Sequence, residues 1–289
     1  YGAKNFIVTI APSVLNAFFI NYADGVVLEG FTINGGHSQF NLFDGSIVAT
    51  ALDLEDLVGV GTRSGIFIQH SEGVKIDKML VKNFDGFGYR LANLGTVGGA
   101  NVYGFLEGVD ISNSAAQNCY MGYRYGDRGE YSRASNIKAI HCACGISVCA
   151  GNITIVNGQF DNNRVGTHVG AGGNNSHGSF IGGTNNHNSL RGAFIANIIN
   201  GHLFTGVNFF DGHIEIYNSL GVNITGGLIA SEITATLNAN QGAMISNNIF
   251  SSTGGYNAGT INKTGAGKLF LDNNRFTSGK ADTTINGIL

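Results

Sequence analysis

Short apolar phrases recur along the chain, and glycine or asparagine bounds each of them. Within a phrase, apolar and polar residues alternate, as in Asn152-Ile-Thr-Ile-Val-Asn-Gly and Gly221-Val-Asn-Ile-Thr-Gly-Gly. An alternation of period two puts every second side chain on one face, which predicts short β-strands with one buried face. No apolar pattern of period 3.6 persists, so the sequence does not predict helical repeats.

The phrases return at intervals that suggest a coil. They begin at Gly25, Gly73, Gly108, Asn136, Asn152, Gly178, Gly201, Gly221, Gly242 and Gly267. The steps after Asn152 are 26, 23, 20, 21 and 25 residues, and the earlier steps are 48, 35, 28 and 16. We interpret the step of 48 as two turns, because Gly65-Ile-Phe-Ile offers a strand between them. Such a period fits one strand-rich coil per repeat.

One coil cannot bury its apolar face alone, whereas coils stacked about 4.8 Å apart close a hydrophobic cylinder. Glycine and asparagine tolerate the left-handed backbone angles of sharp corners. Proline would remove a hydrogen-bond donor from the ladder between strands, and the chain has only one. The sequence therefore predicts an all-β fold, a right-handed single-stranded parallel β-helix of about 10–11 coils. A β-sandwich would instead place strands every ~8–12 residues without a coil-length period.

We expect one β-helix domain over residues 1–289, as a piece of a longer polypeptide. Within it, 1–23 is expected to form an entry or cap region, 24–151 loop-rich coils, and 152–282 regular coils.

Composition excludes several classes of function. Only 12% of residues are charged and the net charge is −3, which does not favour nucleic-acid binding. No stretch reaches the ~20 apolar residues that span a bilayer, so membrane insertion is not expected. The four cysteines lack paired zinc-ligand spacing, and we expect free core thiols, with no metal and no cofactor. They are Cys119, Cys142, Cys144 and Cys149.

The phrases at Asn152 and Gly221 resemble the rung motif of the pectin-lyase-like superfamily of right-handed parallel β-helices, over about Asp24 to Asn274. Within it, the chain looks most like a bacteriophage tailspike or tail-appendage body, and Tyr1-Gly-Ala-Lys is similar to the start of a phrase that opens many tailspike β-helices. The resemblance implies a homotrimer that binds, and often cleaves, a host surface polysaccharide or teichoic acid. It also implies a place on the virion tail, outside the cell, after folding in the host cytoplasm.

A tyrosine- and arginine-rich stretch is the first candidate site. Six of the ten tyrosines fall between Tyr89 and Tyr131, and three of the eight arginines between Arg124 and Arg133. Tyrosine rings offer flat faces to sugars, and arginine offers a planar fork to carboxylate or phosphate. The candidate glycan-binding residues here are Tyr89, Arg90, Tyr103, Tyr123, Arg124, Tyr125, Arg128 and Tyr131. Asp127 and Glu130 are candidate catalytic carboxylates, and a solvated loop or a trimer contact is the alternative.

A second candidate site lies in the regular coils. Asp161, His187 and Asp211 follow their phrases by nine, nine and ten positions, which would place them in one column. Asp161 and Asp211 would then be an acid–base pair about 9–10 Å apart, with His187 between them to orient water. A polar ladder at a corner is the alternative. Glu232 follows Gly221 by eleven positions and is a further member.

A third group is Phe210-Asp-Gly-His-Ile-Glu-Ile-Tyr. Alternation predicts that Ile214 and Ile216 face the core, whereas His213, Glu215 and Tyr217 share the outer face. Any half-exposed strand would show this pattern.

The sequence and the resemblance together favour a tailspike-type protein that binds and depolymerises a host surface glycan, as a glycoside hydrolase rather than a lyase. The alternatives are a non-catalytic receptor-binding or structural spike, and a secreted polysaccharide lyase or hydrolase. Two exposed carboxylates about 5–10 Å apart along one groove would favour hydrolysis.

Overall fold

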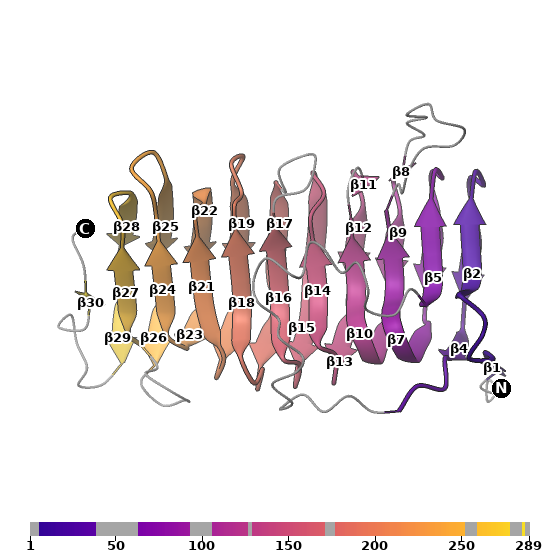
Figure 1. The fold of residues 1–289 in the computed structure, drawn as a ribbon. Coiled ribbons are helices and arrows are strands. Elements are labelled where there is room, and N and C mark those ends of the chain that lie inside the picture. The colour runs from indigo at the N-terminus through magenta and orange to yellow at the C-terminus, as the bar shows by residue number, and fades with distance from the viewer. Residues whose placement is uncertain are drawn as a thin grey trace.

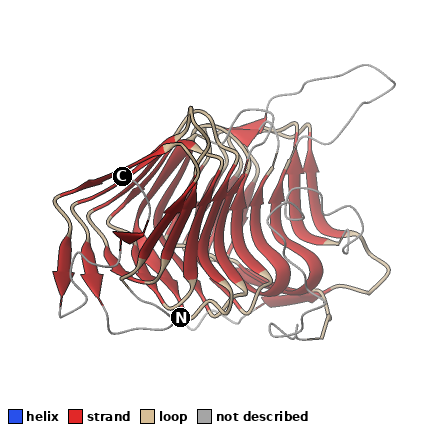
Figure 2. Ribbon diagram, turned by 60° about the vertical axis from the view of Figure 1, so that its left-hand side comes forward, coloured by secondary structure: helices blue, strands red, loops and turns tan. Residues whose placement is uncertain are grey.

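The computed structural model describes residues 6–38, 63–92, 106–126, 129–170, 177–251 and 259–277, and the backbone of Ile285–Asn286. They form a parallel β-solenoid of about nine turns, close to the number expected, in which three sheets run side by side along one axis (Figure 1). We call these sheets A, B and C. In each coil the chain passes from sheet C to sheet B and then to sheet A. Figure 2 shows the strands stacked in rows, with loops at the corners between them.

Sheet A faces the viewer in Figure 1 and is built from strands paired in parallel with their neighbours. Its strands are β2 (Asn16–Asn21), β5 (Ser64–Gln69), the second half of β7 (Leu80–Leu91), the second half of β10 (Ala115–Tyr125), β14 (Cys144–Val148), β16 (Val165–Gly170), β18 (Arg191–Ala196), β21 (His213–Tyr217), β24 (Ile233–Thr236), β27 (Ile261–Thr264) and β30 (Ile285–Asn286).

Sheet B uses the first halves of β7 and β10 and the second halves of β15 and β17. Its strands are β1 (Phe6–Thr9), β4 (Phe31–Asn34), β7, β10, β13 (Lys138–Ile140), β15 (Ile153–Asp161), β17 (Gly178–Asn186), β20 (Asn208–Phe210), β23 (Leu228–Ala230), β26 (Ile249–Ser251) and β29 (Arg275–Thr277).

Sheet C takes the first halves of β15 and β17. Its strands are β3 (Val27–Glu29), β6 (Lys75–Asp77), β9 (Asp110–Ser112), β12 (Arg133–Ser135), β15, β17, β19 (His202–Thr205), β22 (Leu220–Thr225), β25 (Gly242–Ser246) and β28 (Lys268–Asp272). A separate pair, β8 (Leu106–Glu107) and β11 (Gly129–Glu130), lies between sheets A and C along the chain.

Two of the expected coil boundaries are wrong. Val27 pairs directly with Lys75, so the step of 48 residues is one coil with a long insertion rather than two turns. Asp110, Arg133 and Thr154 are in register in sheet C, which gives steps of 23 and 21 residues. The phrase at Asn136 belongs to sheet B instead, because strands of both sheets show the same alternation.

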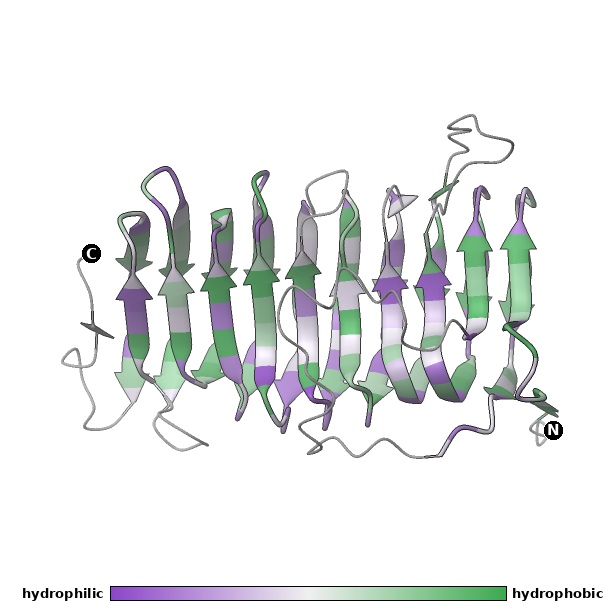
Figure 3. Cartoon of the chain, viewed as in Figure 1, coloured by the Kyte–Doolittle hydropathy of each residue, from purple (hydrophilic) through white to green (hydrophobic). Residues whose placement is uncertain are grey.

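Alternate side chains fill the cylinder, and Figure 3 shows the resulting bands of hydrophobic and hydrophilic residues along the strands. The inward positions of sheet A are buried and mostly apolar. They include Ile66, Tyr89, Tyr123, Ile146, Thr167, Ala193, Ile214 and Ile233. The four cysteines are free and buried, in agreement with the expected core thiols. No helix long and apolar enough to span a membrane occurs in the described residues.

Asparagines with positive φ form a hydrogen-bonded ladder at the corner between sheets C and B. Asn157 donates to Asn136 at 2.8 Å, Asn136 donates to Asn113 at 3.2 Å, and Asn113 donates to Asp77 at 2.8 Å. The φ angles of these asparagines lie between 48° and 55°, which asparagine tolerates better than most residues. The ladder therefore combines the required backbone angle with a bond between successive coils.

Candidate functional site

The outer face of sheet A carries a column of side chains in register, one from each coil. From β5 to β27 this outer column runs Phe67, Arg90, Arg124, Ser147, His168, Phe194, Glu215, Thr234 and Asn262. Ser147, His168 and Phe194 are fully buried although they point out of the cylinder. The half-buried residues of the column lie on the two flanks of this buried centre, where solvent reaches them.

On the N-terminal flank, two arginines lie next to each other on neighbouring strands. Arg90 and Arg124 are in register, and the Arg90 guanidinium stacks on Phe67 and Phe87, 4.7 and 4.5 Å from their ring centres. Burial and, next, the charge of Arg124 lower the pKa of Arg90 to about 10. Among the described residues, no carboxylate lies within 4.0 Å of Arg90. The flank therefore offers positive charge to an anion.

The buried centre continues from Arg124. One guanidinium nitrogen donates to Ser147 Oγ at 2.6 Å and to Cys149 Sγ at 3.0 Å, and Ser147 Oγ lies 2.9 Å from His168 Nδ1. The His168 ring stacks on Phe194 with 5.6 Å between centres. Burial, with the charges of Arg124 and Arg191, lowers the pKa of His168 to about 3. This histidine is therefore a neutral packing residue.

The C-terminal flank brings two glutamates, an arginine and a histidine together. Arg191 Nε donates to Glu215 Oε2 at 2.7 Å, and His213 Nδ1 lies 3.7 Å from Glu232 Oε2. The exposed fractions of these four side chains lie between 17% and 31%, so solvent and a ligand can reach them. Asn262 donates to Glu232 Oε1 at 2.6 Å.

The arrangement of this flank follows from β-strand alternation. His213, Glu215 and Tyr217 point outward from β21, whereas Ile214 and Ile216 are buried, as expected from the sequence. Arg191 and His213 are in register, and Ile214 pairs with Ile233, so Glu232 follows in the same line. The two glutamates thus lie on one face, although only part of the group stood out in the sequence, because Glu232 comes from the next coil.

The predicted tyrosine site is wrong for three of its tyrosines. Tyr89, Tyr123 and Tyr125 are fully buried in the cylinder, and the rings of Tyr89 and Tyr123 stack with 4.6 Å between centres. The Tyr123 hydroxyl donates to the carbonyls of Ser114 and Lys138. Alternation turns these rings inward and the arginines between them outward, so the tyrosines cannot contact a surface glycan.

The remaining candidates of that stretch are not in the core. Tyr131 is 63% exposed at the corner between sheets A and C. Glu130 is in register with Glu107 of the preceding coil, and its side chain accepts a hydrogen bond of 3.5 Å from Asn152. The structure does not bring Glu130 next to Asp161 or Asp211. Tyr103, Asp127 and Arg128 lie outside the described residues.

The expected column of Asp161, His187 and Asp211 is off by one residue. Asp161 is in register with Asn186, which is in register with Phe210, while His187 Nε2 lies 3.4 Å from Asp211 Oδ2. Asp161 accepts a hydrogen bond from Thr184, and burial raises the pKa of its carboxyl. His187 and Asp211 both have positive φ, which is typical of a corner ladder.

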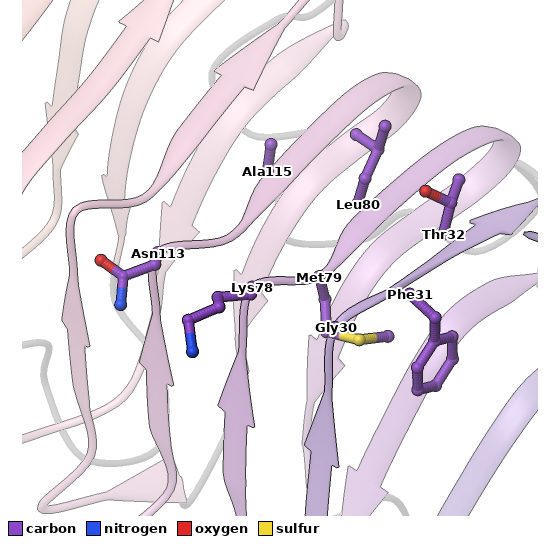
Figure 4. A pocket seen from close by; sticks show the side chains of 8 residues that line it. All are labelled: Gly30, Phe31, Thr32, Lys78, Met79, Leu80, Asn113 and Ala115. Atoms are coloured by element: carbon purple, nitrogen blue, oxygen red, sulfur yellow. The ribbon is translucent and has the colours of Figure 1, made fainter. Parts of the chain in front are cut away.

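A groove lies at the corner between sheets C and B (Figure 4). Its lining includes Lys78, Met79 and Asn113. Lys78 forms ion pairs with Glu29 and Asp77 at 2.8 and 3.0 Å. Its charge is therefore compensated, and the lining holds no carboxylate for acid–base chemistry. In the described part of the chain, no group of three or more histidine, cysteine or carboxylate side chains could hold a metal ion.

No protein-family model matches the sequence, and no curated protein matches it either. Among solved structures, the chain is similar to the A-module of the mannuronan C-5 epimerase AlgE4 from Azotobacter vinelandii, with a TM-score of 0.52. The two chains are 14% identical, and the match covers 93% of this chain and 76% of the epimerase chain. This likeness concerns the fold alone, and it confirms the parallel β-helix expected from the pectin-lyase-like phrases.

Proposed function

We propose that this protein binds an acidic surface glycan on the outer face of sheet A and acts on it, in the manner of a tailspike. The observation that carries the proposal is Arg90, a half-buried guanidinium held between two phenylalanine rings beside a second arginine. A desolvated cation gains most from a carboxylate, sulfate or phosphate group, because a charge-assisted hydrogen bond is stronger there than in water.

The fold supports a glycan as the ligand. The name of the similar structure gives mannuronan, a polysaccharide, as the substrate of that enzyme. Sheet A also carries one residue of the outer column per coil, so an extended polymer could contact more than one coil. A homotrimer on a virion tail, folded in the host cytoplasm, is part of the same proposal, and light scattering on the purified protein tests the trimer.

The test of the binding site is the variant Arg90→Gln. We expect it to weaken binding to an acidic polysaccharide by about tenfold or more, since a hydrogen bond to a charged group is worth about 1.5–3 kcal/mol. Titration against polymannuronate, polygalacturonate, a sulfated galactan and a teichoic acid measures it, with neutral dextran for comparison.

Arg133→Gln is the matched control, because Arg133 is an exposed arginine on sheet C. Equal affinity of the parent and Arg90→Gln for every acidic polymer that binds would contradict the Arg90 assignment. Binding of none of the four polymers by the parent would contradict the proposed function. Binding without any release of fragments would favour the non-catalytic receptor-binding spike. The catalytic roles of Asp127, Glu130, Asp161 and Asp211 stay predictions, for which release by the Asn and Gln variants is the measurement.

A further inference from the structure

We propose that Phe19, in the first strand of sheet A, is the stacking platform for a neutral sugar ring of the same glycan whose acidic group binds at Arg90. The inference rests on the proposed function and adds a second contact for the polymer. It also narrows the ligand to a heteropolysaccharide, in which neutral units occur beside acidic ones.

Phe19 extends the outer column of sheet A by one strand beyond β5. It is in register with Phe67, which is in register with Arg90 of β7. The rings of Phe19 and Phe67 lie 5.3 Å apart with 30° between their planes, and the Arg90 guanidinium lies 4.7 Å from the centre of the Phe67 ring. The two rings and the guanidinium therefore form one continuous row of flat groups.

The Phe19 ring is open to a ligand. Phe19 is 52% exposed, whereas Phe67 is only 7% exposed. Among the described strands, β2 pairs only with β5, and it is the first strand of sheet A (Figure 1). A flat apolar face of this kind suits the C–H face of a sugar ring. An exposed ring by itself is common on protein surfaces, and the neighbouring amides distinguish this one.

Two part-exposed amide side chains lie beside the rings. Asn21 and Gln69 are in register, each two residues beyond its phenylalanine and therefore on the same outer face. Gln69 Nε2 donates to Asn21 Oδ1 at 3.2 Å, and His70 Nδ1 lies 3.0 Å from the same oxygen. Within the described residues, these contacts leave Asn21 Nδ2 and Gln69 Oε1 for a ligand. A donor and an acceptor beside a flat apolar face match a sugar ring and its hydroxyls.

The unit bound on this platform is neutral. The side chains that would contact it are two phenylalanines and two amides, and an anion placed against them would lose water without gaining a counter-charge. Arg90 lies two strands from Phe19, or about 10 Å at about 4.8 Å per strand. The acidic group and the stacked ring therefore belong to different units of one polymer that runs along the solenoid axis over β2, β5 and β7.

The experiment titrates the parent and Phe19→Leu against two polymers. One is a galactan with sulfate on every second unit, and the other is polygalacturonate, in which every unit is charged. We expect the parent to bind the galactan more tightly. Phe19→Leu should bind the galactan about three- to tenfold more weakly, because leucine has no flat ring for stacking, whereas Phe19→Tyr should bind it as the parent does.

Phe270→Leu is the matched control, because Phe270 is 56% exposed on sheet C, away from this column. It should bind both polymers as the parent does. Salt separates the two contacts of the polymer. Raising the ionic strength should weaken binding of the parent and of Phe19→Leu by the same factor, since salt screens charges and not stacking. Arg90→Gln should lose part of that salt dependence.

Parental affinity of Phe19→Leu for the galactan would overturn the inference, and a loss of affinity in Arg90→Gln would then leave the proposed function standing. Equal losses of Phe19→Leu on both polymers would contradict the neutral unit, and so would a parent that prefers polygalacturonate. A parent that binds no acidic polymer contradicts the proposed function, and this inference falls with it. A melting temperature of Phe19→Leu within a few degrees of the parent shows that its fold is intact.

Discussion

At the scale of single residues, the buried tyrosines show that chemistry-bearing side chains can serve the core. Tyr123 donates its hydroxyl to two backbone carbonyls, at 2.8 Å to Ser114 and 3.3 Å to Lys138. Such a bond satisfies polar groups that would otherwise be buried without a partner. We infer that Tyr123 stabilises the stack of coils rather than a ligand.

Tyr123→Phe should therefore lower the free energy of unfolding by about 1 kcal/mol, because it removes one buried donor. Denaturant titration measures the loss, and glycan affinity should be unaffected. Tyr131→Phe is the matched control, since this ring is 63% exposed. A loss of affinity in Tyr123→Phe at unchanged stability would contradict the core assignment.

His168 predicts how stability depends on pH. Its pKa falls from 6.5 to about 3 on folding, so between these values the unfolded chain binds a proton that the folded chain does not. The stability it contributes is present above about pH 6.5 and is lost progressively as the pH falls toward 3. The slope from one such group is about 1.4 kcal/mol per pH unit.

His168→Gln should remove that slope while keeping a polar side chain beside Ser147. Unfolding of the parent and the variant, followed at several pH values between 7 and 4, measures the difference. Parallel curves for the two proteins would show that His168 is not the acid-sensitive group.

At the scale of the strand, a stripe of glycines near the N-terminal ends of the sheet A strands allows the backbones of neighbouring coils to pack closely. The stripe comprises Gly65, Gly88, Gly122, Gly145, Gly166 and Gly192. A Cβ on Gly122 would lie 2.5 Å from the Gly145 carbonyl oxygen and 2.9 Å from Ala139 Cβ. The need for glycine here is space between neighbouring backbones, not a left-handed angle.

Gly122→Ala should therefore destabilise the protein by about 1–3 kcal/mol, the usual cost of overpacking a dense core. Gly192→Ala is the control in the same stripe, because its Cβ would meet nothing nearer than 3.6 Å. Thermal unfolding of both variants measures the contrast, and equal melting temperatures would show that the backbone relaxes around the added methyl group.

Strand alternation and corner residues were enough to predict the parallel coil from the sequence. The same alternation, however, occurs in sheets B and C, so alternation alone does not tell that the phrase at Asn136 lies within a coil, in sheet B, and does not begin a new one. The site was harder, because its members come from different coils and register decides which of them meet. Tyr123-Arg124-Tyr125 held a usable signal: alternation puts Arg124 opposite the two rings.

At the scale of the whole molecule, each coil contacts mainly the coils before and after it, as in other solenoids. The described strands continue the same three sheets from β2 to β27, with sheet A along one side (Figure 1). Position in the sequence therefore translates into height along the axis. Arg90 lies in β7 and Glu215 in β21, on the same side.

The number of strands between two residues of sheet A therefore gives their distance along the axis. The strands β10, β14, β16 and β18 lie between the N-terminal flank, at Arg90, and the C-terminal flank, at Glu215. Five strand spacings of about 4.8 Å separate them by about 24 Å. A mono- or disaccharide is therefore too short to touch both flanks at once. Inserting or removing one coil between the flanks would change this separation by about 4.8 Å.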